Sequence, residues 1–188
     1  HNLSIKHQEW LIKNFKNVES HLVNLDELFK TFKDSLSNFN DEHGMANSRA
    51  RLRMTTLYQV AAANKGIVVG TGNKVEDFGV GFYTKYGDGG VDISPIADLM
   101  KSEVYQLGRE LGVIQEILDA KPTDGLWGDD RTDEQQIGAT YDELELVMNN
   151  STPSTDRENQ VLEIYNKFHK QNKHKMINIP IFKKDENV

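Results

Sequence analysis

The chain has 188 residues, of which 37% are hydrophobic, and it contains 14 Gly and no Cys. This size and composition are typical of one globular domain with its own core. The lack of Cys excludes disulfides, zinc sites with cysteine ligands and thiol nucleophiles on this chain. A net charge of −7 argues against non-specific nucleic-acid binding, which depends on a surplus of Lys and Arg, but it leaves room for a small anionic ligand. No apolar run approaches the roughly 18 residues of a membrane span, so we expect a cytoplasmic protein that binds neither nucleic acid nor membranes.

Helices and strands are predicted to alternate along the first part of the chain. Spaced apolar side chains indicate a helix over residues 4–17, followed by a short strand that ends at residues 21–25. A longer helix, rich in Ala, Leu, Met and Arg, is predicted over residues 45–64 and stops at Gly66. Ile67-Val68-Val69 then has the composition of a buried strand. The alternation predicts a single α/β domain with a parallel sheet flanked by helices.

Three further segments have the apolar spacing of amphipathic helices. A stripe behind an Asp26 cap is predicted to face the core and comprises Leu25, Leu28, Phe29, Phe32 and Leu36. A second helix closes at Gly112. The last helix begins with a capping box at Thr155-Asp156-Arg157-Glu158, and its apolar face comprises Val161, Ile164, Tyr165 and Phe168. Between the last two helices, residues 128–136 are acidic and turn-rich, which predicts a loop or a lid.

Three arginines alternate within the predicted helix over residues 45–64. On a helix each is turned by about 200° from the last, so Arg49 and Arg53 share one side and Arg51 faces away. This division allows one guanidinium group to meet an anionic ligand while the others pair elsewhere. Three ordinary surface arginines are the alternative interpretation.

A glycine-rich segment, residues 70–90, follows the predicted strand. It opens with Gly70-Thr71-Gly72-Asn73, at the carboxyl edge of the sheet, where α/β proteins bind ligands. Thr71 offers a hydroxyl group to a nucleotide, and Glu76 offers hard oxygen atoms suited to magnesium. Each of these residues can equally be an ordinary solvated loop residue.

The most informative segment is Gly81-Phe82-Tyr83-Thr84-Lys85-Tyr86-Gly87-Asp88-Gly89-Gly90-Val91-Asp92. Aromatic side chains among glycines can enclose a flat heterocycle, Lys85 can meet an anion, and Asp92 can accept a proton or hold a donor. A structural turn with an exposed lysine is the alternative.

These motifs, taken together, resemble those of the ammonia-dependent NAD+ synthetases, which belong to the N-type ATP pyrophosphatases. The resemblance covers nearly the whole chain, with the blocks in the family's order. Besides the two glycine-rich motifs and Glu76, it rests on Ala50-Arg51-Leu52-Arg53-Met54, Pro95-Ile96-Ala97-Asp98-Leu99-Met100-Lys101, Lys121-Pro122-Thr123, Thr132-Asp133-Glu134, Tyr141-Asp142 and His174-Lys175. It implies an adenine nucleotide alpha hydrolase-like, Rossmann-like fold.

The resemblance also implies an activity and a set of site residues. The family adenylates the carboxylate of nicotinic acid adenine dinucleotide with ATP and then displaces AMP with ammonia, which yields NAD+. It follows that Thr71, Lys101 and Thr123 contact ATP and that Glu76 binds Mg²⁺. The dinucleotide contacts are Arg51, Lys85, Asp92, His174 and Lys175. Lys101 and Asp92 are then the expected catalytic residues, and we hypothesise that ammonium loses its proton near Asp92. A homodimer is also implied.

One family motif, the pyrophosphate-binding loop Ser-Gly-Gly-x-Asp-Ser, does not occur in these 188 residues. Backbone N–H groups of such a loop cradle phosphates, and its Asp adds a carboxylate for magnesium. We therefore expect that the N-terminal first strand and this loop are missing from the chain, and that the 188 residues alone are inactive. Two rivals stay open: a non-catalytic dinucleotide-binding or dimerisation module, and another amidating member of the superfamily.

Overall fold

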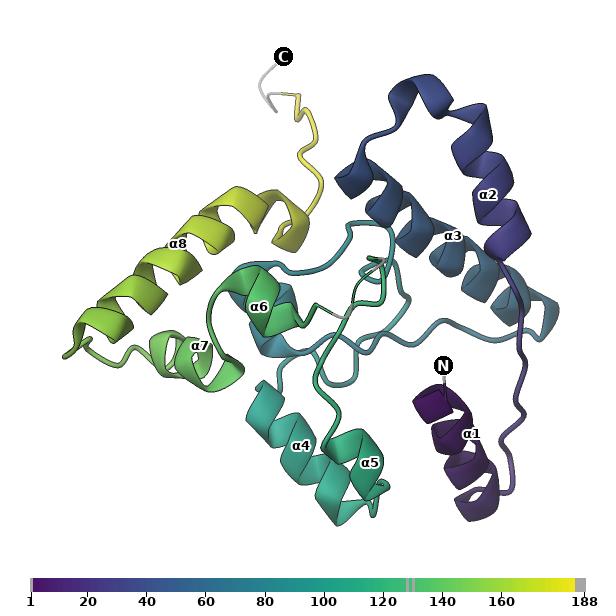
Figure 1. Cartoon of the computed structure of the whole chain (residues 1–188), viewed down its shortest axis with the longest axis horizontal. Helices are drawn as coiled ribbons and strands as arrows, with labels where there is room; N and C mark the ends of the chain where they lie inside the picture. The colour runs from purple at the N-terminus through teal and green to yellow at the C-terminus, as the bar shows by residue number, and fades with distance from the viewer. Residues whose placement is uncertain (1, 128, 130, 185–188) are drawn as a thin grey trace.

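The computed structural model describes residues 2–127, 129 and 131–184. In Figure 1, helices α2 and α3 lie on one side of the molecule and α7 and α8 on the other, with the long segment between α3 and α4 running between them. The helices are α1 (Asn2–Asn14), α2 (Asp26–Ser35), α3 (Glu42–Ala63), α4 (Lys101–Glu110), α5 (Gln115–Leu118), α6 (Asp133–Ile137), α7 (Tyr141–Met148) and α8 (Asp156–Met176), together with a 3₁₀ turn η1 (Ser37–Phe39) and a π-helix η2 (Val75–Val80).

The predicted parallel sheet is wrong for the described residues, in which a single parallel bridge joins Val69 to Ile93. The Asp92 N–H donates to the Val68 carbonyl (3.0 Å), and the Gly70 N–H donates to the Ile93 carbonyl (2.7 Å). A strand needs a neighbour that satisfies its backbone groups. Among the described residues, the segment around Val68 has this one strand neighbour. The segment at residues 21–25, which was predicted as a strand, has none.

The hydrophobic core lies where η2, α7 and α8 pack together. Its buried members are Val75, Val80, Ile137, Ala139, Tyr141, Leu144 and Val161. Helix α8 begins as predicted, because the Thr155 and Glu158 side chains each hydrogen-bond to the other's backbone N–H. The predicted apolar face of α8 is confirmed: Val161 is buried, and Ile164, Tyr165 and Phe168 pack against the core.

The predicted core stripe over residues 25–36 is not buried. None of its side chains falls below the intermediate range of exposure, and Leu28 is 50% exposed. The stripe of α2 packs on α3, where the Arg49 guanidinium lies over the Phe29 ring, 4.4 Å from its centre. Asn24 rather than Asp26 satisfies the start of this helix, because its Oδ1 accepts from the Asp26 N–H (2.7 Å). A helix that packs on one neighbour leaves part of its apolar stripe in water.

Three further helix boundaries can be compared with the sequence patterns. Helix α3 starts three residues before residue 45, because the Asp41 side chain caps it by accepting from the Gly44 N–H. Gly112 does follow α4, in a left-handed conformation (φ +72°). The predicted loop over residues 128–136 is wrong for its last part, since Thr132 caps α6. Residues 128 and 130 lie outside the described residues.

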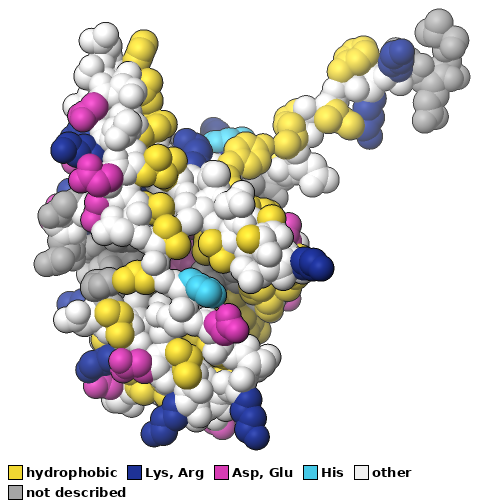
Figure 2. Space-filling view, turned by 90° about the vertical axis from the view of Figure 1, so that its right-hand side faces the viewer, with side chains coloured by type: hydrophobic (Ala, Val, Ile, Leu, Met, Phe, Trp, Pro, Cys, Tyr) yellow, Lys and Arg dark blue, Asp and Glu magenta, His cyan; other side chains and the backbone are white. Residues whose placement is uncertain are grey.

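The segment after α8 projects away from the body of the molecule, as Figure 2 shows. Its apolar side chains are exposed: Ile177 by 49%, Ile179 by 61%, Ile181 by 73% and Phe182 by 91%. Among the described residues, no helix is both long and apolar enough to cross a membrane.

The core assignment predicts a large difference between two leucines on one helix. Leu144 is fully buried, whereas Leu146 on the same helix is 52% exposed. Because a cavity replaces the lost methyl groups, Leu144→Ala should lower the free energy of unfolding by about 2–5 kcal/mol. The control Leu146→Ala should cost less than about 1 kcal/mol. Urea denaturation measures both, and equal losses would contradict this placement of the core.

Candidate functional site

The predicted motif at residues 70–73 positions Glu76. Asn73 is 2% exposed, and its Oδ1 accepts from the backbone N–H groups of Val75 (3.0 Å) and Glu76 (3.2 Å). This side chain satisfies two N–H groups at the start of η2, which have no earlier turn to bond to. A π-helix is rare and is frequently found at functional sites. The Asn73 cap therefore fixes where the Glu76 carboxylate emerges.

Glu76 meets Lys101 and Tyr141, which come from two other elements. Lys101 Nζ lies 2.8 Å from Glu76 Oε1, and the Tyr141 hydroxyl donates to the same oxygen (2.7 Å). Both charged side chains are mostly buried, at 18% and 16% exposure. The Lys101 ammonium also lies 4.7 Å from the centre of the Tyr141 ring. The structure thus brings together the expected magnesium ligand and the expected ATP-binding lysine.

A second carboxylate, Asp133, lies behind this group. Its Oδ2 is 3.2 Å from the Tyr141 hydroxyl, and its buried Oδ1 has no hydrogen-bond partner among the described residues. Burial, together with the Glu76 charge, raises the pKa of Asp133 to about 6. Burial also raises the pKa of Tyr141 above its ordinary range, so its hydroxyl stays a donor. Sequence reasoning quoted Asp133 and Tyr141 as motif residues and missed that they meet Glu76.

This arrangement could bind a magnesium ion with only one or two protein ligands. The described residues contain no group of three His, Cys, Asp or Glu side chains placed to hold a metal. Mg²⁺ is typically bound through one or two carboxylates together with substrate phosphates and water. Glu76, with the unpaired Asp133 oxygen nearby, meets that requirement.

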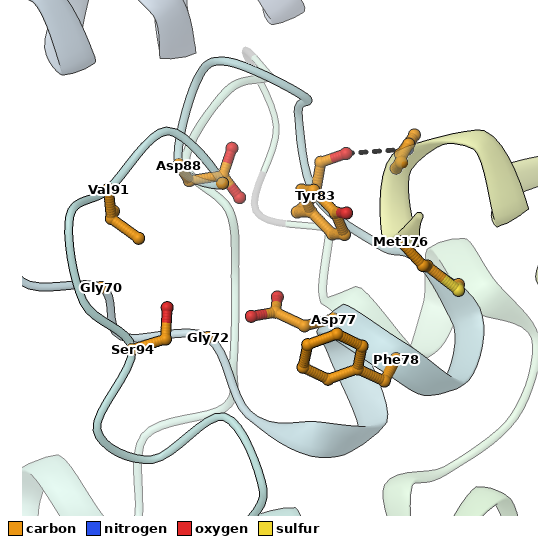
Figure 3. A pocket seen from close by; sticks show the side chains of 11 residues that line it. Gly70, Gly72, Asp77, Phe78, Tyr83, Asp88, Val91, Ser94 and Met176 are labelled. Carbon is orange, nitrogen blue, oxygen red and sulfur yellow. Dashed lines mark hydrogen bonds between the residues drawn. The ribbon is translucent and has the colours of Figure 1, made fainter. Parts of the chain in front are cut away.

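A pocket of about 160 Å³ lies between η2, the glycine-rich segment and the end of α8, as Figure 3 shows. Its lining comprises Gly70, Gly72, Asp77, Phe78, Tyr83, Asp88, Gly89, Val91, Ser94, Lys175 and Met176. Lys175 Nζ donates to the carbonyls of Gly81 (2.8 Å) and Tyr83 (2.7 Å). The end of α8 is thereby held against the segment that forms the other wall.

Burial perturbs the ionisable groups of this pocket. It raises the pKa of Asp77 from its ordinary 3.8 to about 6, with help from the charges of Glu76 and Asp88. It also raises the pKa of Asp88, although the Thr84 N–H donates to that carboxylate and opposes the shift. The pKa of Lys175 is lowered by burial. Sequence reasoning did not single out Asp77, because nothing in the neighbouring sequence shows that its carboxyl group lies in a pocket.

Four of the predicted dinucleotide contacts lie close to one another, and one of them, Lys175, lines this pocket. Arg51 donates through Nε and Nη2 to the Lys85 carbonyl (3.3 and 3.2 Å). Lys85 Nζ donates in turn to the His174 carbonyl (2.6 Å), and Lys175 follows on the same turn of α8. Helix α3, the glycine-rich segment and α8 therefore meet at these side chains.

The fifth predicted contact, Asp92, is engaged elsewhere. Its Oδ2 accepts from the Val68 N–H (2.7 Å) and its Oδ1 from the Tyr58 hydroxyl (3.1 Å). It does not line the pocket in which Asp77 and Asp88 lie.

The two predicted ATP-binding threonines lie on exposed loops. Thr71 lies two residues after Val69 of the parallel bridge. Thr123 lies next to Pro122, whose carbonyl accepts from the Asp133 N–H (3.0 Å). That bond links the Thr123 loop to the residues around Glu76.

Comparison with known proteins assigns the chain. The NAD synthase family model matches residues 1–185. The chain belongs to the NAD synthase family. The NH(3)-dependent NAD(+) synthetase of Alkaliphilus metalliredigens is 40% identical over 179 residues, which cover 94% of this chain and 68% of that protein. The synthetase of the same name from Mesoplasma florum is 44% identical over 129 residues, covering 67% of this chain and 52% of that protein. The chain thus spans from about half to two thirds of the length of these relatives.

Solved structures share the fold. The NMN synthetase from Francisella tularensis matches with a TM-score of 0.85 and 33% identity, over 96% of this chain and 73% of that one. The NH3-dependent NAD synthetase from Campylobacter jejuni matches with a TM-score of 0.69 over 89% of this chain and 67% of that one. At 24% identity, the second match supports the fold alone. The described residues hold one isolated parallel bridge, so these matches rest on the arrangement of the helices and loops.

The partly buried carboxyl group of Asp77 predicts a pH-dependent stability difference. Because its native pKa is raised to about 6, the native state keeps this proton at pH values where the unfolded state has lost it. The free energy of unfolding of the wild type should therefore fall as the pH rises from about 4 to about 6. Asp77→Asn removes this contribution. Compared with the wild type, the variant should therefore have a higher free energy of unfolding above pH 6 than it has below pH 4. Urea denaturation across this range measures the difference, and a constant difference would contradict the raised pKa of Asp77.

Proposed function

We propose that this protein is an ATP-dependent ligase that amidates nicotinic acid adenine dinucleotide with ammonia and forms NAD+. The observation that carries the proposal is the meeting of Glu76 and Lys101 in a chain of the NAD synthase family. An ammonium group and a hard carboxylate side by side can receive the phosphates of ATP and their magnesium ion.

The chemistry requires activation of a carboxylate, which is a poor electrophile. A carboxylate oxygen of the substrate attacks the α-phosphorus of ATP and displaces pyrophosphate. Ammonia then attacks the acyl carbon, AMP leaves, and the proton lost from nitrogen passes to a base or to water. Lys101, Thr71 and Thr123 contact ATP in this proposal. Glu76 would hold a Mg²⁺ ion, which would supply positive charge to offset the negative charges that must meet.

The substrate side of the proposal uses the residues gathered around α8. Arg51, Lys85 and Lys175 supply positive charge for the dinucleotide phosphates, and His174 supplies a ring nitrogen that can hydrogen-bond to them. Asp92 completes the set, with the deprotonation of ammonium as its hypothesised role. Full synthesis at low ammonium by an Asp92→Asn variant would remove that role.

Several finer properties belong to the same proposal. The fold is adenine nucleotide alpha hydrolase-like, the 188 residues form one domain, and the protein acts in the cytoplasm as a homodimer. Free ammonia is the nitrogen source. The assay should use the protein made from its complete coding sequence, because the pyrophosphate-binding motif is not among these residues. Dinucleotide binding without turnover in that protein would favour a non-catalytic module instead.

A second candidate substrate follows from one comparison. The Francisella structure, which matches this chain with a TM-score of 0.85, is titled an NMN synthetase. With this candidate the protein would catalyse the same class of amidation, and only the acid substrate would change, from the dinucleotide to nicotinic acid mononucleotide. Values of kcat/KM for the mononucleotide and the dinucleotide, measured with ATP and ammonium, distinguish the two candidates.

The proposal predicts unequal effects at two lysines. Lys101→Met removes the ammonium group next to Glu76 and should lower kcat/KM for ATP by about 100-fold. Lys74 forms a surface ion pair with Asp98, whose side chain is 95% exposed. Lys74→Met should therefore change kcat/KM by less than about twofold. Formation of NAD+ or its mononucleotide counterpart gives both values, and an active Lys101→Met variant would refute this ATP site.

A further inference from the structure

The alternating arginines of α3 contact two different loops. Arg51 donates to the Lys85 carbonyl, on the dinucleotide side of the proposed site. On the other face of the helix, Arg49 Nη1 donates to the Leu126 carbonyl (2.9 Å) and Arg53 Nη2 to the Gly125 carbonyl (3.2 Å). The last two contacts hold residues 122–127, which include Thr123.

Hydrogen bonds within the loop also stabilise the conformation of residues 122–127. Asp124 Oδ1 accepts from the Leu126 N–H (2.9 Å), and its Oδ2 accepts from Trp127 Nε1 (3.1 Å) and from Gln136 Nε2 of α6 (3.2 Å). Gly125 lies between these contacts in a left-handed conformation (φ +60°). At the start of the loop, the Pro122 carbonyl accepts from the Asp133 N–H. The loop is thus fixed at one end to α3 and at the other to the residue behind Glu76.

The guanidinium groups of Arg49 and Arg53 repel each other, so other interactions must hold them in place. Burial and the charge of Arg49 lower the pKa of Arg53, while Asp124 opposes this shift. Arg49 keeps its place through the Leu126 carbonyl and the Phe29 ring. Both arginines therefore direct their donors to carbonyls of one loop despite their mutual repulsion.

We propose that Arg49 and Arg53 are positioning residues that hold the Thr123 loop in place for ATP. This inference rests on the proposed function, which assigns Thr123 to ATP. Helix α3 then serves both substrates, through Arg51 on one face and through Arg49 and Arg53 on the other. The two sides can be separated experimentally, because their contacts go to different loops.

Trp127 reports directly on the loop. It stacks on His43 of α3, with ring centres 6.3 Å apart, and the Arg131 guanidinium lies 4.6 Å from its ring centre. The chain has two Trp residues, so Trp10→Phe leaves Trp127 as its sole tryptophan. In that background, acrylamide quenching of fluorescence measures how firmly residues 122–127 dock on α3.

The test compares Arg53→Ala with Arg109→Ala in the protein made from the complete coding sequence. Arg109 is an exposed arginine of α4 and serves as the matched control. Arg53→Ala should increase quenching of Trp127 and raise the KM for ATP about tenfold. The KM for the acid substrate and kcat should change less than about twofold. Arg109→Ala should leave all four quantities unchanged.

A conservative variant and a binding measurement complete the test. Arg53→Lys keeps the charge and one donor, so it should fold even if the alanine variant does not and should raise the KM for ATP about threefold. An unchanged KM for ATP in both variants, or equal rises in both KM values, would overturn the inference. If the wild type shows no turnover, the proposed function fails. The dissociation constant for ATP then decides separately whether Arg53 positions the loop.

Discussion

The ion pair between Lys101 and Glu76 is the interaction on which the arrangement of the site depends. It joins α4 to η2, and the Tyr141 hydroxyl adds α7 to the same carboxylate oxygen. A mostly buried ion pair persists only when further hydrogen bonds offset its desolvation, and Tyr141 supplies one. The core beneath it, built from η2, α7 and α8, sets the positions from which these side chains reach one another.

Helix α3 imposes a second constraint, at a distance from this ion pair. Its period of 3.6 residues sends alternating arginines to opposite sides, and each side meets backbone carbonyls of a different loop. Backbone carbonyls occur in every loop, so such contacts leave no mark in the sequence of the loop itself. Helix α3 thereby hydrogen-bonds to both the Lys85 segment and the Thr123 loop. The Pro122 carbonyl in turn links that loop to the Asp133 N–H.

Local patterns predicted the parts of the structure that depend on neighbours in sequence. The division of the arginines on α3, the capping box of α8 and the left-handed Gly112 all follow from spacing or backbone preference. The predicted sheet was wrong because strands need partners distant in sequence, and the described residues supply such a partner at one bridge only. The contact of Tyr141 and Asp133 with Glu76 joins residues far apart in sequence, and no periodicity reports it.

The central claim is that the carboxylate of Glu76 receives the magnesium ion of bound ATP. Calorimetric titration of the wild type and a Glu76→Gln variant with ATP, with and without Mg²⁺, tests it most directly. The account predicts that Mg²⁺ strengthens ATP binding by the wild type at least about tenfold and has little effect on the variant. The variant should bind ATP without Mg²⁺ no more weakly than the wild type does. An unchanged magnesium dependence in the variant would contradict the account.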